Sequence, residues 1–433
     1  MQTFHKFRKG GFCILLDVCG GGVHVVDEDI YNALDSADYA SSPEYAELCG
    51  AGLFSGGDDY REYADMNVSA PLKAMCLQVA HECNLRCGYC FAEGLIENGV
   101  RGIMPPETAK KAVDFLISGS GEREHLEIDF FGGEPLLAWD TVRQTVAYAK
   151  EQAVIHGKEF RFTITTNGLL LDDEKNAFIN AEMCNVVLSL DGRKEVNDRL
   201  RPCPNGAGSH DIILPKFKKL IKARNKPGCT DYFIRGTFTN YNLDFADDVL
   251  AIAGEGFGNI SIEPVTVTPD VDFAIRAEHL PRIKDEYDRL FELMRDNGNE
   301  WSFFHLCIDL NDSPCILKRL RGCGAGNEYI AVAPDGNIFP CHRYTGIEEW
   351  KMGNINLGTP LNETIKTYFA KMHIYAKEEC PDCWARFYCG GGCNAESFIF
   401  EGDAKKQPEI FCEMMKKRIE CAIALSTCKA MQK

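Results

Sequence analysis

The strongest constraint on the fold is a regular alternation of short apolar strands and amphipathic helices from Leu72 to the region of residue 300. The predicted strands are Met75–Val79, Leu126–Phe131, Phe160–Thr166, Val186–Leu190, Tyr232–Thr239 and Ile260–Val265. The predicted helices between them are Pro106–Ser118, Val142–His156, Asp172–Asn180, Leu214–Ala223, Phe245–Gly254 and Ile283–Arg295. Alternating elements of this kind form a parallel sheet with right-handed crossovers. Six units predict an α/β fold with a partial (β/α)6 TIM-type barrel rather than a complete eight-fold one.

The first four predicted strands end in polar or glycine-rich motifs. HECNLRCGYC follows the first strand, GGEP follows the second, TTNG ends the third and SLDG ends the fourth. In parallel sheets of this type, ligands bind at the carboxyl ends of the strands. The four motifs are therefore expected to meet in one site on one rim of the barrel.

The motif HECNLRCGYC places Cys83, Cys87 and Cys90 within eight residues, and no further cysteine follows until Cys184. A four-iron cluster normally has four thiolate ligands. Three thiolates leave one iron open, which is what a reactive cofactor requires. A structural zinc site with His81 as its fourth ligand is the alternative, and the GGEP motif on the next strand disfavours it.

This spacing, with Tyr89 before the last cysteine and GGEP in the expected place, resembles the radical S-adenosylmethionine (radical SAM) superfamily. The resemblance implies that the open iron chelates the amino and carboxylate groups of SAM. One electron from the cluster would then cleave SAM to methionine and a 5′-deoxyadenosyl radical. The SAM-contacting residues that it implies are Tyr89, Gly132, Gly133, Glu134, Asn167, Ser189 and Arg201.

These residues have different expected roles. Gly132 and Gly133 would let the backbone approach the methionine amine, and a carboxylate or carbonyls would accept its protons. Asn167 and Ser189 would bind the ribose or the methionine carboxylate, with strand-end capping as the alternative. Arg201 would bind a carboxylate, with a surface salt bridge as the alternative.

A second cysteine pattern occupies the last third of the chain, where a weak apolar pattern predicts short elements and folding energy from metal clusters. Cys323 is followed by 12 residues, Gly336, four residues and Cys341, and then by Cys380-x2-Cys383-x5-Cys389-x3-Cys393 and Cys412. This arrangement resembles the seven-cysteine motif of SPASM domains, which bind two auxiliary [4Fe-4S] clusters in radical SAM peptide maturases.

The SPASM resemblance implies a ligand set for each auxiliary cluster. Cys380, Cys383, Cys389 and Cys412 would hold the outer cluster, and Cys323, Cys341 and Cys393 would hold the inner one. Either Cys315 or a substrate thiol would complete the inner cluster, and the sequence leaves both possibilities open.

The N-terminal residues 11–26, GFCILLDVCGGGVHVV, predict a β-hairpin with a turn at Gly20–Gly22. Helical patterns around Asp29–Leu34 and Pro43–Ala51 and a polar linker follow. This unit resembles the start of maturases for six-cysteines-in-forty-five-residues (SCIFF) peptides, where a winged-helix-like domain binds a leader peptide by adding a strand to its sheet. A structural cap on the barrel is the alternative.

The predicted domains are a precursor-recognition domain over residues 1–68, a radical SAM core over 69–300 and a SPASM domain over 301–433. A formal charge of −17 argues against a nucleic-acid partner. No stretch approaches the roughly 20 apolar residues of a membrane span. With 21 cysteines, an odd number, and no signal peptide, we expect a cytoplasmic metalloprotein rather than a disulfide framework.

The resemblances imply an enzyme that forms thioether cross-links in a cysteine-rich precursor peptide with a leader. Its cofactors would be SAM and three [4Fe-4S] clusters, and its electron donor a ferredoxin or flavodoxin. The alternatives are formylglycine formation, as in anaerobic sulfatase maturases, or another SPASM reaction such as C–C cross-linking or epimerisation. Electron transfer without SAM chemistry is disfavoured, because a carrier cluster is normally fully ligated.

Overall fold

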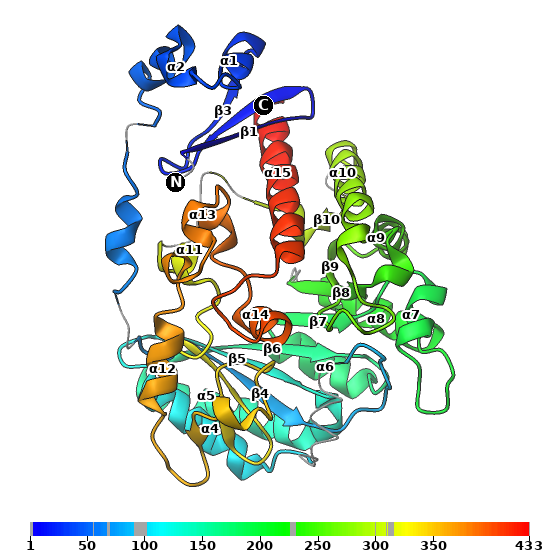
Figure 1. Ribbon diagram of the computed structural model, residues 1–433. Coiled ribbons are helices and arrows are strands. Elements are labelled where there is room, and N and C mark those ends of the chain that lie inside the picture. The colour runs from blue at the N-terminus through cyan, green and yellow to red at the C-terminus, as the bar shows by residue number, and fades with distance from the viewer. Residues whose placement is uncertain are drawn as a thin grey trace.

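The structure is a computed structural model that describes residues 3–54, 56–66, 70–90, 102–225, 231–298, 300–308, 310 and 316–432. Figure 1 shows a small N-terminal sheet with two helices, a large twisted sheet backed by helices, and a C-terminal part with several short elements and one long helix. Among the described residues, no helix is both long and apolar enough to span a bilayer.

The large sheet confirms the predicted strand pattern. Its six central strands are parallel and run in chain order: β4 (Ala74–Ala80), β5 (His125–Gly132), β6 (Glu159–Thr166), β7 (Asn185–Ser189), β8 (Tyr232–Phe238) and β9 (Asn259–Pro264). The short strand β10 (Ser302–Phe303) pairs in parallel with β9. The sheet stays open at this edge, so the fold is the partial barrel that the sequence predicts.

One face of the sheet is covered by helices, as Figure 1 shows. They are α4 (Pro106–Gly119), α5 (Trp139–His156), α6 (Asp173–Glu182), α7 (Lys194–Leu200), α8 (His210–Asn225), α9 (Phe245–Gly254) and α10 (Leu280–Asp296). On β5, Leu126, Ile128 and Phe130 are fully buried in this core. Because side chains alternate along a strand, Asp129 and Phe131 point to the opposite, concave face.

The C-terminal part continues the same sheet at its other edge. Strand β11 (Tyr329–Val332) pairs in parallel with β4, and β12 (Asn337–Phe339) and β13 (Gly353–Asn354) extend it as antiparallel strands. The helices α11 (Ile316–Arg321), α12 (Glu363–Ala370), α13 (Arg386–Cys389) and α14 (Asn394–Glu401) are short, as predicted. This hydrogen-bonded continuity fixes the C-terminal part against the barrel.

The prediction of short elements is wrong for the end of the chain, where α15 (Glu409–Met431) is a single helix of 23 residues. It packs on α10, and Arg418 Nε donates to Tyr287 Oη at 2.8 Å. Small buried residues of this helix, among them Cys421, Ala422 and Ala424, lie beside larger ones such as Ile423. The helix was missed because the density of cysteines hid an apolar face made of small side chains.

The N-terminal unit contains the predicted hairpin, formed by β2 (Phe12–Asp17) and β3 (Val23–Val26). A third strand, β1 (Phe4–Lys9), pairs with β2 and was not predicted, because its basic residues mask the alternation of apolar positions. The helices α1 (Glu28–Ala33) and α2 (Pro43–Gly50) follow. His5 stacks on Trp384 with ring centroids 3.7 Å apart, which docks this unit on the C-terminal part.

Candidate active site and cluster sites

The cysteine loop after β4 is held against the end of α7. Gly88 N donates to Leu200 O at 2.8 Å, and Arg86 N donates to Pro202 O at 2.9 Å. Cys90 N donates to Cys87 O at 3.0 Å, which closes a tight turn between two of the three cysteines. Burial raises the pKa of the Cys83 thiol to about 11, so iron binding has to displace its proton. The residues after Cys90, up to 101, lie outside the described ranges.

The zinc alternative would use His81 as its fourth ligand. The His81 ring lies within hydrogen-bond distance of Gln78 Oε1, at 3.0 Å. Within the described ranges, no three His, Cys, Asp or Glu side chains surround the position of one metal ion. A four-iron cluster differs in this respect, because each thiolate binds a different iron and the sulfurs therefore stand further apart.

The GGEP motif lies directly against the cysteine loop. Gly133 N donates to Ala80 O at 2.6 Å, and Glu134 N donates to Glu82 O at 2.9 Å. A Cβ on Gly132 would lie 2.1 Å from Ala80 O, and a Cβ on Gly133 would lie 2.3 Å from Glu82 O. The glycines are therefore needed for close approach to the backbone that leads into Cys83, a contact that the sequence does not reveal.

Gly133→Ala is expected to disrupt the first cluster site without affecting the auxiliary sites. The added methyl group displaces the backbone beside Cys83, and a misplacement of about 1 Å costs roughly a hundredfold in rate. We expect a loss of about four irons per chain and a fall in 5′-deoxyadenosine formation of about a hundredfold, measured by iron analysis and chromatography. Gly254→Ala is the matched control, because no described residue beyond its own helix lies within 4 Å of the place its methyl group would take. Equal iron content and activity in the two variants would contradict the assignment.

Glu134 is completely buried, and its carboxylate is occupied by protein donors. Oε1 accepts from Leu136 N at 3.0 Å and from Thr166 Oγ1 at 2.8 Å, and Oε2 accepts from Asn167 N at 2.8 Å. Burial raises the pKa of Glu134 to about 7, although these hydrogen-bond donors act to lower it. The carboxylate thus joins the ends of β5 and β6, which is a structural role beside the predicted contact with SAM.

Asn167 and Ser189 lie at the predicted strand ends. Asn167 Nδ2 donates to Asn84 Oδ1 at 2.8 Å and lies 3.6 Å from Cys83 Sγ, so this side chain borders the cysteine loop. Ser189 is half-buried at the end of β7. Their contacts with SAM stay predictions.

Arg201 belongs to a buried polar cluster that includes one residue missed by sequence analysis. Arg201 Nη1 donates to Tyr89 Oη at 3.0 Å, and Tyr89 donates to Asp191 Oδ2 at 2.6 Å. Thr237 N donates to Asp191 Oδ1 at 3.0 Å, which ties the cluster to β8. Its position in the strand-end motif SLDG is the sequence feature that could have identified Asp191 as a site residue. The surface salt bridge proposed as an alternative for Arg201 is wrong, because only 7% of this residue is exposed.

The residues at this rim fit SAM bound to a three-cysteine cluster. Arg201 Nε is buried and makes no hydrogen bond to the described part of the chain. A buried guanidinium donor of this kind suits a carboxylate, and SAM carries one on its methionine. The residues at the rim therefore match both parts of the expected cofactor. The cysteine thiolates would bind iron, and the Arg201 guanidinium would bind the carboxylate of SAM.

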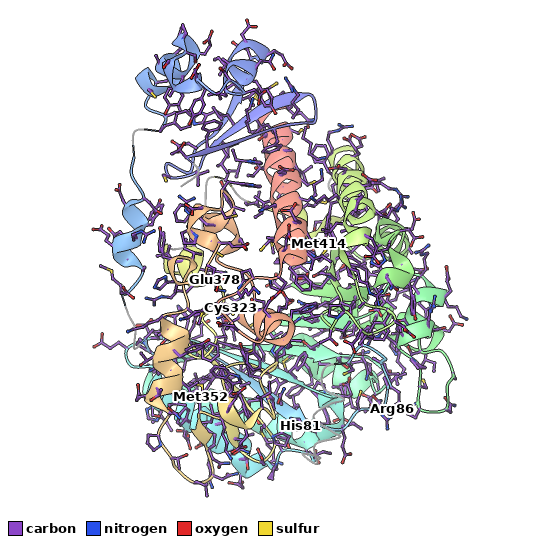
Figure 2. All side chains as sticks on the ribbon, in the orientation of Figure 1. His81, Arg86, Cys323, Met352, Glu378 and Met414 are labelled. Carbon is purple, nitrogen blue, oxygen red and sulfur yellow. The ribbon has the colours of Figure 1, made fainter. Side chains whose placement is uncertain are left out.

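The inner cysteines of the C-terminal part lie close enough to influence one another. Burial raises the pKa of the Cys341 thiol to about 12, and the nearby Cys393 and Cys323 sulfurs contribute to this rise. The pKa of Cys393 is also raised, by burial first, then by the Glu396 carboxylate and to a smaller extent by Cys323. Figure 2 shows Cys323 in the C-terminal part, apart from His81 at the end of β4. Cys315 lies outside the described residues.

The outer cysteines form a separate group. Burial raises the pKa of Cys412 to about 12, and Cys389, Cys380 and Cys383 add to this effect. Burial and the sulfurs of Cys389 and Cys383 likewise raise the pKa of Cys380 to about 12. The thiols that raise the pKa of Cys412 and of Cys380 thus all belong to the predicted outer set. Their assignment as cluster ligands stays a prediction. All cysteines in the described ranges are free thiols.

The inner set borders the concave face of the barrel. The ring of His342, next to Cys341, packs against Phe131 at a tilt of 41° with ring centroids 5.0 Å apart, and the His342 carbonyl accepts from Gln78 Nε2 at 3.3 Å. Gln78 and Phe131 belong to β4 and β5, the strands that lead into the cysteine loop and GGEP. The inner set and the SAM site therefore face a shared interior.

Comparison with protein families identifies the two motif regions. Residues 77–232 match the family model of the radical SAM superfamily, and residues 323–384 match the SPASM iron–sulfur cluster-binding domain. The chain contains a radical SAM domain followed by a SPASM domain. It is therefore a radical SAM enzyme whose cofactors are SAM with one [4Fe-4S] cluster and auxiliary iron–sulfur clusters.

Relatives of this radical SAM–SPASM chain carry out different reactions. It is 23% identical over 86% of its length to the radical SAM cyclopropyl synthase TigE of Paramaledivibacter caminithermalis, covering 84% of that protein. It is 26% identical over 81% of its length to a cysteine-type anaerobic sulfatase-maturating enzyme of Clostridium perfringens, covering 96% of it. The chain also resembles the structure of anSMEcpe with bound AdoMet and a Cp18Cys peptide, with a TM-score of 0.68 and 22% sequence identity. The match covers 83% of this chain and 99% of the anSMEcpe chain.

Proposed function

We propose that this enzyme forms thioether cross-links in a ribosomally made, cysteine-rich precursor peptide. The observation that carries the proposal is the inner set of three cysteines, Cys323, Cys341 and Cys393, beside the concave face that leads to the SAM site. Three ligands leave one place of a four-iron cluster for a fourth sulfur, and a substrate thiol supplies one. Relatives named as a sulfatase-maturating enzyme and a mycofactocin maturase support a peptide or protein substrate.

The assigned ligands are Cys83, Cys87 and Cys90 for the SAM cluster, the inner set for one auxiliary cluster, and Cys380, Cys383, Cys389 and Cys412 for the other. When bound, these groups supply one-electron chemistry: an adenosyl radical that removes hydrogen, and an electron acceptor. Asn167, Arg201 and the GGEP backbone orient SAM. The low-potential electron comes from a donor such as ferredoxin or flavodoxin.

The net reaction joins a cysteine sulfur to a carbon of another substrate residue. One C–H bond and one S–H bond break, and one C–S bond forms. The hydrogen atom from carbon leaves with 5′-deoxyadenosine, the thiol proton goes to solvent, and the surplus electron goes to the auxiliary clusters. The protein contributes by holding the sulfur deprotonated and close to the reacting carbon.

The N-terminal unit is proposed to bind the leader of the precursor. Its sheet ends in the short strand β3, whose Val25 is 42% exposed. A peptide adding to such an edge gains backbone hydrogen bonds. A sulfatase maturase needs no separate leader-binding domain. The presence of this N-terminal unit therefore supports leader-dependent peptide chemistry over sulfatase maturation.

The experiment first searches the genes beside this one for a short cysteine-rich open reading frame. Its peptide is then incubated anaerobically with reconstituted enzyme, SAM and dithionite. We expect the product to lose two hydrogen atoms per bridge and to have fewer alkylatable thiols by mass spectrometry. A leaderless peptide should react more slowly than the full precursor. Thiols that all remain alkylatable, or an aldehyde at a former cysteine, would overturn the thioether proposal in favour of another SPASM reaction.

A further inference from the structure

Lys377 is a buried lysine in the SPASM domain whose ammonium has only neutral hydrogen-bond acceptors. The residue is 3% exposed. Its Nζ donates to Gly391 O and, at 2.7 Å, to Asn394 Oδ1. When the side-chain amide of Gln407 is rotated so that its oxygen and its nitrogen both have hydrogen-bond partners, the oxygen accepts from the same Nζ at 3.2 Å. In the described part of the chain, no carboxylate forms an ion pair with Lys377.

A buried charge without a counter-charge is unfavourable by several kcal/mol. The groups around Lys377 that become anionic when a cluster binds are cysteines. Burial lowers its pKa, and the sulfurs of Cys380, Cys389, Cys393 and Cys323 act in the opposite direction. Two of these cysteines belong to the outer set and two to the inner set. Gly391, which accepts from Lys377, lies between Cys389 and Cys393, and Asn394 directly follows Cys393, so Lys377 lies beside a ligand of each set.

The position of Lys377 is set by the backbone segments on which it and the neighbouring cysteines lie. Lys377 lies three residues before Cys380, at the end of a short 3-10 turn (Ile374–Ala376). Its side chain passes Gly391, where a Cβ would lie 3.3 Å from Lys377 Cδ and Cε. Gly391 stands between Cys389 and Cys393, the outer and inner ligands that are closest in sequence.

Two other cations beside the cysteines differ from Lys377 because each has a glutamate partner. Arg343 Nη1 lies 3.0 Å from Glu396 Oε1, and Lys416 Nζ lies 2.9 Å from Glu413 Oε1. Each of these cations thus has a carboxylate beside it, although Glu413 also pairs with Lys284. The charge of Lys377, by contrast, is directed at the cysteines.

We propose that Lys377 is the shared counter-charge of the two auxiliary clusters and raises the reduction potential of both. The inference depends on the ligand sets assigned above but not on the reaction proposed for the substrate. Reduction adds negative charge to a cluster, and a nearby positive charge in a low-dielectric interior stabilises the reduced form. Charge and burial are among the factors that set iron–sulfur potentials.

The experiment compares Lys377→Gln, Lys377→Met and Lys377→Arg in full-length protein whose Cys83, Cys87 and Cys90 are replaced by alanine, so that only the auxiliary clusters are present. Midpoint potentials are measured by dithionite titration followed by electron paramagnetic resonance. We expect Lys377→Gln and Lys377→Met to make the reduction of both clusters about tenfold less favourable, equivalent to a fall of about 59 mV for one electron. Lys377→Arg should keep the potentials near those of the parent protein.

The matched control is Lys405→Met, which removes an exposed lysine of the same domain and should leave the potentials unchanged. Unchanged potentials in both neutral variants, or a shift of one cluster alone, would overturn the proposal. If the neutral variants lose auxiliary iron while Lys377→Arg retains it, the requirement for a positive charge is supported. Loss of iron in all three variants would indicate a packing role and overturn it.

Discussion

Replacing Cys83, Cys87 and Cys90 together by alanine is expected to abolish 5′-deoxyadenosine formation and to lower the iron content from about twelve to about eight per chain. The reason is that these three thiols form one loop, separate from the seven cysteines of the SPASM domain. Burial raises the pKa of the Cys83 thiol to about 11, so this thiol holds its proton until iron displaces it. Removing all three therefore removes the whole first site, without leaving a partial ligand set.

The measurements are iron and sulfide analysis and chromatography of the reaction with SAM and dithionite. The matched control is a triple alanine variant at Cys49, Cys184 and Cys203, which lie outside both motifs. It should keep full iron and full activity. Continued 5′-deoxyadenosine formation in the first variant, or loss of the same iron in the control, would contradict the assignment of the SAM cluster.

The barrel was predictable because its strands are short apolar runs separated by amphipathic helices. Each of the six predicted strands is found within one or two residues of its expected bounds. Strand β1 and helix α15 were not predictable by the same means. In β1 the apolar positions are interrupted by basic residues that pair with distant partners, such as Lys9 with Asp288. In α15 the buried face is built partly from alanine and cysteine, whose small side chains give a weak periodic signal.

The candidate site, like the fold, has features that the sequence predicts and features that it does not. The cysteine motifs are visible in the sequence because the residues of Cys83–Cys90 and of Cys380–Cys393 are closely spaced along the chain. Contacts between distant segments are not visible. The approach of Gly133 to Glu82, the bond from Tyr89 to Asp191 and the burial of Lys377 between two cysteine sets all depend on how the strands and loops are brought together. Asp191 was in a recognised motif, whereas Lys377 had no sequence signal.

Cys341→Ala is expected to abolish peptide modification while leaving SAM cleavage intact. Cys341 follows β12, and its neighbour His342 reaches the concave face at Phe131, so loss of this ligand disrupts the inner cluster beside the substrate space. The SAM site is held by other contacts, which run from the cysteine loop to Leu200 and Pro202. We expect a loss of about four irons, no cross-linked product by mass spectrometry, and continued formation of 5′-deoxyadenosine without substrate conversion.

Cys315→Ala, measured in parallel, distinguishes the two possible fourth ligands of the inner cluster. If a substrate thiol occupies that place, the variant keeps its iron and adding the precursor peptide changes the spectrum of the inner cluster. If Cys315 occupies it, the variant changes that spectrum before any peptide is added, and the peptide has no further effect on the wild-type cluster. Cross-linked product from Cys341→Ala would contradict the role of the inner set, because the sulfur would then be activated without it.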